Sequence, residues 1–100
     1  MIQSFGDQGT KDIFIGRSSA KARKILPISL LKIACRKLDM MNVAHIINDL
    51  KAPPGNRLEA LAGTLKGFYS IRINDQYRIV FKWSDSDLGP KDVQIMDYHR

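Results

Sequence analysis

The stretch that decides the fold is F-Y-S-I-R-I-N-D-Q-Y-R-I-V-F-K-W, residues 68–83. Its apolar and aromatic side chains fall mainly on odd positions, on both sides of a break at 74–76 (N-D-Q). Strict alternation has the period of a half-buried β-strand, and Asn and Asp at the break favour a turn. The stretch therefore predicts a β-hairpin with one apolar face.

The loop length of this hairpin fixes its register. Both odd-numbered sets face one core only if directly opposed residues have numbers with an even sum. A three-residue loop over 74–76 satisfies this condition and is a common hairpin type. It places Arg72 directly opposite Arg78 on the other face, with Ser70 and Lys82 nearby.

Two opposed arginines allow two interpretations. Like charges directly across a sheet destabilise it, by roughly a few tenths of a kcal/mol or more. Either Arg72 and Arg78 fan apart into solvent, or an anion belongs between them. Because the planar guanidinium suits phosphate, the second interpretation makes this pair a candidate phosphate clamp.

The composition limits the classes of protein to consider. The chain has 100 residues, 44% of them hydrophobic, which predicts one small domain over residues 1–100 with one modest core. Lys and Arg number 16 against 10 acids, which would attract nucleic acid, an acidic protein or an anionic membrane surface. A membrane is the weakest of the three, because no strongly amphipathic basic helix stands at either end and no apolar run reaches the length of a span.

The cysteine content and the first residues bear on the compartment. Cys35 is the single cysteine, so neither an internal disulfide nor a cysteine-based metal cluster is expected. A buried structural thiol fits this position better than a nucleophile. The first residues, M-I-Q-S-F, lead directly into polar residues, so no signal peptide is expected. We expect a cytoplasmic protein with no metal and no cofactor.

The segments around the hairpin predict further elements from their apolar period and their caps. They are a short strand over 2–5, helices over 7–16, 27–42 and 44–50, and a final strand over 92–98. Helices before a run of strands indicate an α+β fold, in which a short N-terminal strand joins a three-stranded antiparallel meander and helices pack on one sheet face. The opposite face is expected to stay open and to carry the arginines, as the functional surface.

The basic run R-S-S-A-K-A-R-K, residues 17–24, has small residues between its charges. It forms either a mobile connector or a first helical turn with a basic face. A charge run of this kind is usually a solvated surface, so no chemistry is assigned to it.

Three motifs together resemble the HigB-type toxins of bacterial toxin–antitoxin pairs, a branch of the RelE/ParE superfamily. They are Y-S-I-R-I-N-D-Q-Y-R-I-V-F (69–81), P-P-G-N-R-L-E-A-L (53–61) and a terminal D-Y-H (97–99). The resemblance implies a RelE-like fold and a ribosome-dependent mRNA endonuclease, an mRNA interferase that cuts A-site codons and arrests growth. Its implied partners are the 70S ribosome with mRNA and a cognate helix-turn-helix antitoxin of the HigA type, and operator DNA is reached only through the antitoxin complex.

The resemblance also implies the site residues. Arg78 matches the arginine of the family's Y/W-R-I motif, and Tyr98 and His99 match its terminal aromatic and histidine, with Asp97 beside them. Arg72 joins this set mainly through the hairpin register. Arg78, His99, Tyr98 and Arg72 are therefore the predicted catalytic residues.

One segment departs from the family pattern. Members commonly have L-K-G-D/N-R before the hairpin, with a lysine that can help the chemistry, whereas residues 61–65 here read L-A-G-T-L. The lysine position is Ala62, and Lys66 is the basic residue that could substitute in space. Lys66, Arg57, Lys82 and Asp97 form the predicted substrate-binding set.

Metal-independent RNA cleavage requires three steps of charge and proton control. The 2′-OH must lose a proton, the phosphorane must be stabilised, and the leaving 5′-oxygen must be protonated. Arg72 and Arg78 can stabilise the phosphorane. His99 has an unperturbed pKa near neutrality and can act as base or acid, while Tyr98 can stack on a base or donate its hydroxyl. Strand parity puts Tyr98 on the arginine face, and His99 reaches that face only if the strand ends or twists there.

Two other functions remain open at this stage. The first is a non-catalytic poison of the same superfamily that binds a protein such as DNA gyrase, against which the terminal D-Y-H speaks. The second is a small basic module that binds RNA or DNA, which predicts salt-sensitive binding of free nucleic acid. Basic charge by itself does not separate these functions from a ribosome-dependent nuclease.

Overall fold

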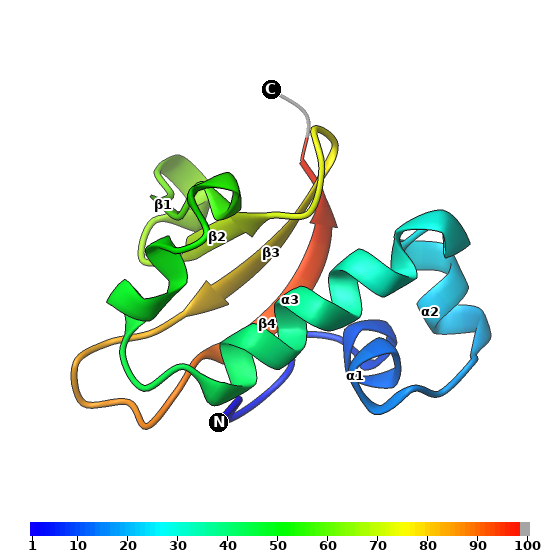
Figure 1. Cartoon of the computed structure of the whole chain (residues 1–100), viewed down its shortest axis with the longest axis horizontal. Coiled ribbons are helices and arrows are strands. Elements are labelled where there is room, and N and C mark those ends of the chain that lie inside the picture. The colour runs from blue at the N-terminus through cyan, green and yellow to red at the C-terminus, as the bar shows by residue number, and fades with distance from the viewer. Residues whose placement is uncertain (99–100) are drawn as a thin grey trace.

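The computed structural model describes residues 1–98 of the chain, in which helices come first and strands follow (Figure 1). The strands pair into an antiparallel sheet in the order β1-β2-β3-β4, so the predicted α+β class is confirmed. The elements are α1 (Gln8–Ile15), α2 (Ala20–Ile25), η1 (Ile28–Leu30), α3 (Leu31–Val43), η2 (Ile47–Lys51), η3 (Pro54–Asn56), β1 (Glu59–Ala60), η4 (Gly63–Leu65), β2 (Tyr69–Arg72), β3 (Tyr77–Lys82) and β4 (Lys91–Asp97), where η marks a 3₁₀ turn.

The β2–β3 hairpin has the predicted register. Residues 69–72 pair with 78–81 in reverse order, which sets Arg72 opposite Arg78. In the loop, Asn74 Oδ1 accepts hydrogen bonds from the backbone N–H groups of residues 76 and 77, at 2.9 and 2.8 Å. This Asx turn is the local reason why the chain reverses at N-D-Q.

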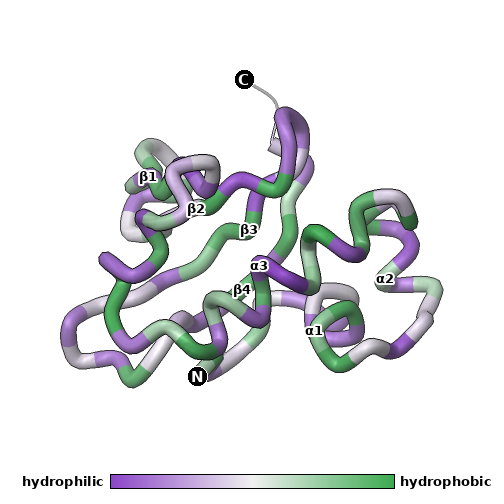
Figure 2. The backbone as a smooth tube through the Cα atoms, in the orientation of Figure 1, coloured by the Kyte–Doolittle hydropathy of each residue, from purple (hydrophilic) through white to green (hydrophobic). Residues whose placement is uncertain are grey.

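The odd-numbered face of the sheet forms the core with the helices. Ile71, Ile79 and Phe81 are 0% exposed and pack in one cluster with Leu38 and Met41 of α3. Figure 2 shows apolar and polar segments alternating along the strands and α3, as the periodicity predicts. Fully burying a side chain of this kind contributes about 1.5–3 kcal/mol, so this face holds the fold together.

Helix α1 begins and ends at the predicted caps. Asp7 Oδ1 accepts from the backbone N–H of Thr10 at 2.6 Å, and Gly16 ends the helix in the left-handed region, at φ 81°. The hydroxyl of the fully buried Thr10 in turn accepts from the backbone N–H of Ile95 at 3.0 Å. The capped helix is thereby tied to β4.

The N-terminal segment differs from its prediction in detail. Residues 2–5 do not form a regular strand, and Phe5 makes an isolated parallel bridge to Val93 of β4. The backbone N–H of Gly6 donates to the Val93 carbonyl at 2.8 Å, so the segment still lies along the sheet edge. The strand that completes the sheet is instead β1, which comes from the irregular region before the hairpin.

Residues 44–50 were predicted as a helix, and this prediction is wrong for their first half. Ala44 and Ile46 are extended, and a 3₁₀ turn follows at 47–51. The carboxylate of Asp49 explains the boundary, because it accepts from the backbone N–H groups of His45 and Ile46 at 2.9 and 3.2 Å. Side-chain capping of this kind competes with a continuous helix. In the basic run 17–24, the helical alternative is correct for residues 20–24, which belong to α2, whereas residues 17–19 connect α1 to α2.

Candidate functional site

Arg78 lies on β3, on the sheet face that points away from the helices, and is 7% exposed. Its Nε donates to Ser70 Oγ at 2.7 Å and its Nη2 donates to the Arg57 carbonyl at 2.6 Å. Its Nη1 lies 3.8 Å from a carboxylate oxygen of Glu59. A buried charge is tolerated only when it is paired and hydrogen-bonded, and these contacts meet that requirement while fixing the plane of the guanidinium.

The segment that precedes β1 brings the Arg57 carbonyl to this position. Asn56 is 0% exposed, and its amide donates to the carbonyls of Leu50 and Ala52 at 3.1 and 3.2 Å. Its oxygen accepts from Nζ of Lys37 on α3. Arg57 follows in the left-handed region, at φ 47°, which turns its carbonyl toward the sheet. The buried amide thus holds the loop against α3 and sets the anchor of Arg78.

Lys37 of α3 is influenced by two other cations, Arg36 and Arg72. Burial lowers its pKa, and the charges of Arg36 and Arg72 lower that pKa further. Lys37 is therefore close enough to Arg36 and to Arg72 for each charge to act on it. An anion that approaches these cations meets a positive potential.

Arg72 is opposite Arg78 in the register but has a different environment. Its guanidinium pairs with Asp75 in the loop, and the two side chains are 32% and 98% exposed. The hydrogen bond from Arg72, the charge of Arg72 and then that of Arg57 hold the pKa of Asp75 below its ordinary value. The repulsion between Arg72 and Arg78 is reduced because each guanidinium is bound to different neighbouring groups. An anion between the two arginines stays a prediction.

The end of β4 is fixed to the same loop. The backbone N–H of Tyr98 donates to the Gln76 carbonyl at 2.6 Å, and Gln76 Nε2 donates to Asp97 Oδ2 at 3.0 Å. Since Val93 and Ile95 are buried in the core, parity puts Tyr98 on the arginine side of the sheet. The predicted catalytic His99 lies outside the residues that the structure describes.

The predicted cations Lys66 and Lys82 lie toward the other end of the hairpin. Lys82 Nζ is 4.8 Å from the centroid of the Phe68 ring and 3.9 Å from Asp92 Oδ2. Lys66 is exposed in the connection between β1 and β2, beside the start of β2, whereas Arg72 is at its end. The replacement of the family lysine at Ala62 by Lys66 stays a prediction.

The sheet face that carries the arginines is more covered than expected. Ser70 and Val80 are 0% exposed and Arg78 is nearly buried, so the expectation of an open face was wrong for its centre. The cause is β1, which pairs Glu59 with Ser70 and places the preceding loop over Arg78. The guanidinium is buried by this segment and not by the helices α1–α3.

Glu59 is the member of this arrangement that the sequence reasoning missed. Its side chain is 35% exposed, it is opposite Ser70 in the register of β1 with β2, and its carboxylate lies 3.8 Å from Arg78 Nη1. A two-residue strand is too short to show a period of two, so the available signal was the R-L-E part of the 53–61 motif. We name Arg57, Glu59, Ser70, Arg72 and Arg78 the arginine cluster.

Residues 1–98 contain neither a candidate metal site nor a candidate membrane span. No group of three or more His, Cys, Asp and Glu side chains in that range is placed to hold a metal ion. In the same range no helix has both the length and the apolar character that crossing a membrane requires.

Comparison with known proteins establishes the class. A family model described as "RelE-like toxin of type II toxin-antitoxin system HigB" matches residues 3–99. The chain therefore belongs to the HigB-like toxin family of type II toxin–antitoxin systems. It is 46% identical to Toxin HigB-1 of Vibrio cholerae over 65 residues, which are 65% of this chain and 68% of that protein.

Two further known proteins are similar to this chain. An uncharacterized protein of Haemophilus influenzae is 43% identical over 64 residues, 64% of this chain and 63% of that protein. Among solved structures, the YoeB–YefM complex from Staphylococcus aureus matches with a TM-score of 0.58 and 22% identity, covering 100% of this chain and 97% of the other. At that identity the match shows a shared fold, which confirms the RelE-like architecture.

Proposed function

We propose that this toxin is a ribosome-dependent endoribonuclease that cleaves mRNA codons in the A site without a metal ion. The observation that carries the proposal is Arg78, a nearly buried cation held by Ser70 and a backbone carbonyl beside the end of β4. Membership of the RelE-like toxin family supports the reaction class. The proposed location is the cytoplasm, where ribosomes and mRNA are found.

Arg78 is assigned to the charge that develops on phosphorus. When the 2′-oxygen attacks, the P–O5′ bond breaks through a phosphorane with additional negative charge. A guanidinium whose plane is already set by Ser70 and the Arg57 carbonyl needs little reorganisation to stabilise that charge. One donor positioned in this way is typically worth about 3 kcal/mol of transition-state stabilisation. Arg72 is assigned to orienting the neighbouring phosphate from the more exposed side.

Proton transfer is assigned to the residues around Arg78. Glu59 is a half-exposed carboxylate 3.8 Å from the guanidinium, and it can take the 2′-OH proton. Tyr98 stands on the same side of the sheet, where it can stack on a base or donate to the leaving 5′-oxygen. His99, next in the chain, is the alternative proton donor because its unperturbed pKa is near neutrality.

The proposed partners follow from the class. A type II toxin is held inactive by a protein antitoxin, and we assign a helix-turn-helix antitoxin of the HigA type, through which operator DNA is bound. The Staphylococcus aureus structure is a complex of YoeB with YefM, so a related fold accommodates a partner protein. The 70S ribosome with mRNA is the proposed substrate complex.

The test is to induce the wild-type chain and Arg78→Ala in bacteria and to map mRNA 5′ ends. Cuts inside codons and growth arrest are expected for the wild type and not for Arg78→Ala. Purified 70S ribosomes programmed with mRNA should support cleavage that free mRNA does not. The products should carry a 2′,3′-cyclic phosphate and a 5′-hydroxyl, as attack by the 2′-OH requires.

Each alternative function gives a different result in these experiments. A poison of DNA gyrase would arrest growth with intact mRNA and would inhibit supercoiling by the purified enzyme. A nucleic-acid-binding module would bind free RNA with strong salt dependence and would leave growth unchanged. Either result, or equal cleavage by Arg78→Ala at equal protein level, would reject the nuclease assignment.

A further inference from the structure

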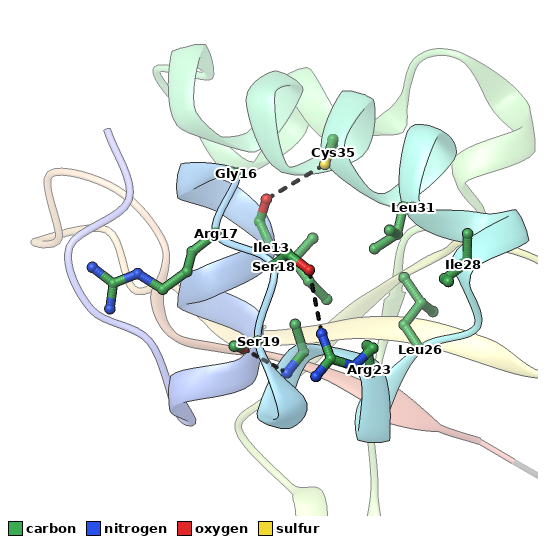
Figure 3. Close-up of a pocket in the computed structure, with 11 residues that line it drawn as sticks. Ile13, Gly16, Arg17, Ser18, Ser19, Arg23, Leu26, Ile28, Leu31 and Cys35 are labelled. Atoms are coloured by element: carbon green, nitrogen blue, oxygen red, sulfur yellow. Dashed lines mark hydrogen bonds between the residues drawn. The ribbon is translucent and has the colours of Figure 1, made fainter.

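A hollow of about 240 Å³ lies between α1, α2 and the start of α3, on the helix side of the molecule (Figure 3). Its floor is formed by Ile13, Ala22 and Leu26, which are 3%, 6% and 2% exposed. Leu31 and Cys35 line it from α3, and burial raises the pKa of the Cys35 thiol, so this side carries no charge at neutral pH. An apolar side chain is the chemistry that fits such a floor.

The rim of the hollow exposes further apolar area. Ile28 lines the hollow and is 74% exposed, and in Figure 3 it stands on the same side as Leu26 and Leu31. Ile15, next to the lining residue Gly16, is 53% exposed. Covering these side chains removes apolar area from water, so a partner that spans the hollow and its rim gains binding free energy.

The two charged residues that line the hollow, Arg17 and Arg23, are both basic, while the carboxylates of Asp12 and Asp39 lie close to the lining residues Ser19 and Cys35. Residues 13–38 contain seven of the 16 Lys and Arg of the chain and none of its 10 Asp and Glu. The rest of the chain has nine bases against ten acids, so this segment accounts for the net charge of +6. Arg17 and Arg23 line the hollow, and Arg23 donates to Ser18 Oγ at 3.2 Å (Figure 3). A complementary partner therefore carries acids on both sides of an apolar edge.

We propose that the hollow receives one amphipathic helix of the antitoxin, with its apolar edge on Ile28 and Leu31 and with Asp and Glu flanking that edge. The proposal rests on the assignment of this chain to a toxin–antitoxin pair. Ribosomal RNA would also be attracted by the cations, but its phosphate backbone has no group that fills an apolar floor. A helix that inserts side chains at positions i, i+3, i+4 and i+7 does fill it.

The hollow is built before a partner arrives. Asp12 accepts from Gln8 at 2.8 Å and from the Ser19 hydroxyl at 2.7 Å, and its backbone carbonyl accepts from the N–H of Arg17 at 2.8 Å. Ser19 also caps α2 by accepting from the Ala22 N–H at 3.0 Å. These bonds fix the connection between α1 and α2, so binding needs little ordering of this region.

The hollow and the arginine cluster lie on different sides of the sheet. The helices that form the hollow pack on the odd-numbered face, whereas Ser70 and Arg78 are on the other face. A helix in the hollow therefore does not fill the space beside Arg78. Antitoxin binding and RNA cleavage can consequently be impaired by separate substitutions, which is what the test exploits.

The probe is the purified full-length protein encoded by the reading frame adjacent to the toxin gene, titrated against the purified toxin. Ile28→Glu should raise the Kd at least tenfold, because it removes an apolar contact and opposes the acids of the helix. Val43→Glu is the matched control, since Val43 is 70% exposed but does not line the hollow, and it should change the Kd less than twofold. Arg23→Glu should weaken binding about fivefold and Lys51→Glu should not.

Activity is measured on the same variants, so that the two proposals fail separately. Ile28→Glu should cleave mRNA and arrest growth like the wild type, but co-expression of the antitoxin should no longer rescue growth. Wild-type affinity in both Ile28→Glu and Arg23→Glu, or equal weakening by the controls, would overturn the docking proposal. So would a loss of 70S association without a change in antitoxin affinity. Absence of mRNA cleavage in every variant would instead overturn the nuclease.

Discussion

The two ends of the arginine-bearing sheet face hold their cations in different ways. Near the loop, Arg78 is 7% exposed and fixed by hydrogen bonds of 2.7 and 2.6 Å. At the other end of β3, the side chain of Lys82 is 47% exposed and has longer contacts, 3.9 Å to Asp92 and 4.8 Å to the Phe68 ring. The same strand thus carries one cation with a set geometry and one that solvent screens.

Arg78 is therefore a preorganised cation, whereas Lys82 is an exposed cation without a fixed position. A fixed guanidinium stabilises developing charge without reorganising, which is the property that catalysis uses. A half-exposed ammonium adds attraction for any anion, but its ion pairs contribute little, typically about 0–1 kcal/mol. The structure therefore ranks the predicted cations by how firmly each is held, and the predictions below test that ranking.

The largest effect is expected for Arg78→Ala. Cleavage should fall about 10²–10³-fold, because a fixed donor is lost at the position of the developing charge. Stability should also fall by about 1–3 kcal/mol, since Ser70 and the Arg57 carbonyl lose their partner in a buried place. Ribosome-dependent cleavage and urea unfolding measure the two effects. Arg78→Lys should restore part of the stability but little cleavage, because an ammonium lacks the planar fork.

Ser70→Ala should have the next largest effect. It leaves the charge of Arg78 in place but removes the acceptor of its Nε, so the guanidinium becomes less fixed. A lost buried hydrogen bond of this kind costs about 1–2 kcal/mol. We expect about a tenfold loss in kcat with little change in KM, measured in the reconstituted ribosome assay. An unchanged kcat would show that positioning of Arg78 does not matter.

Lys82→Ala is the matched substitution at the other end of the same strand. Stability should change by no more than about 0.5 kcal/mol, because the pair with Asp92 is exposed and long. Cleavage at low salt should fall slightly through weaker association, and the difference from the wild type should disappear as salt screens the charge. A loss as large as that of Arg78→Ala would reverse the ranking of the two ends.

The smallest effect concerns the loop ion pair and its dependence on pH. Arg72 holds the pKa of Asp75 below its ordinary value, so the folded state binds the Asp75 proton less tightly than the unfolded state does. The stabilisation is present above the unfolded pKa and is lost as the pH falls through the folded pKa. Asp75→Asn should therefore lower the Tm slightly at pH 7 and not at strongly acidic pH. Thermal unfolding across that range measures it, and a Tm difference that grows in acid would contradict the sign.

The register and the core were predictable, whereas the environment of Arg78 was not. Alternation from Tyr69 to Trp83 and one parity condition are enough to set Arg72 opposite Arg78, because a slip by one residue would expose the apolar set. The burial of Arg78 depends on β1 and the loop before it, which have no period. Glu59 was missed for this reason, and 44–50 was misassigned because one carboxylate, Asp49, caps backbone that would otherwise continue a helix.

Cations were therefore easier to place than to rank. Net charge and register indicated which side of the sheet attracts an anion, but they did not show how firmly Arg72, Arg78, Lys66 and Lys82 are each held. The distinction between them comes from the carbonyl of Arg57, the hydroxyl of Ser70 and the ring of Phe68. Such contacts join segments far apart in the sequence, and no local pattern reports them.

Arg78 is held at residue 57 by a main-chain atom, because its Nη2 donates to the backbone carbonyl oxygen there. Every amino acid has the same carbonyl oxygen, so the hydrogen bond to Arg78 does not depend on which side chain stands at position 57. Because that residue adopts φ 47°, glycine or asparagine would occupy it with less strain than arginine does. The exposed basic side chain at this position can therefore be exchanged, which changes the surface charge, while the carbonyl oxygen that holds the buried guanidinium remains.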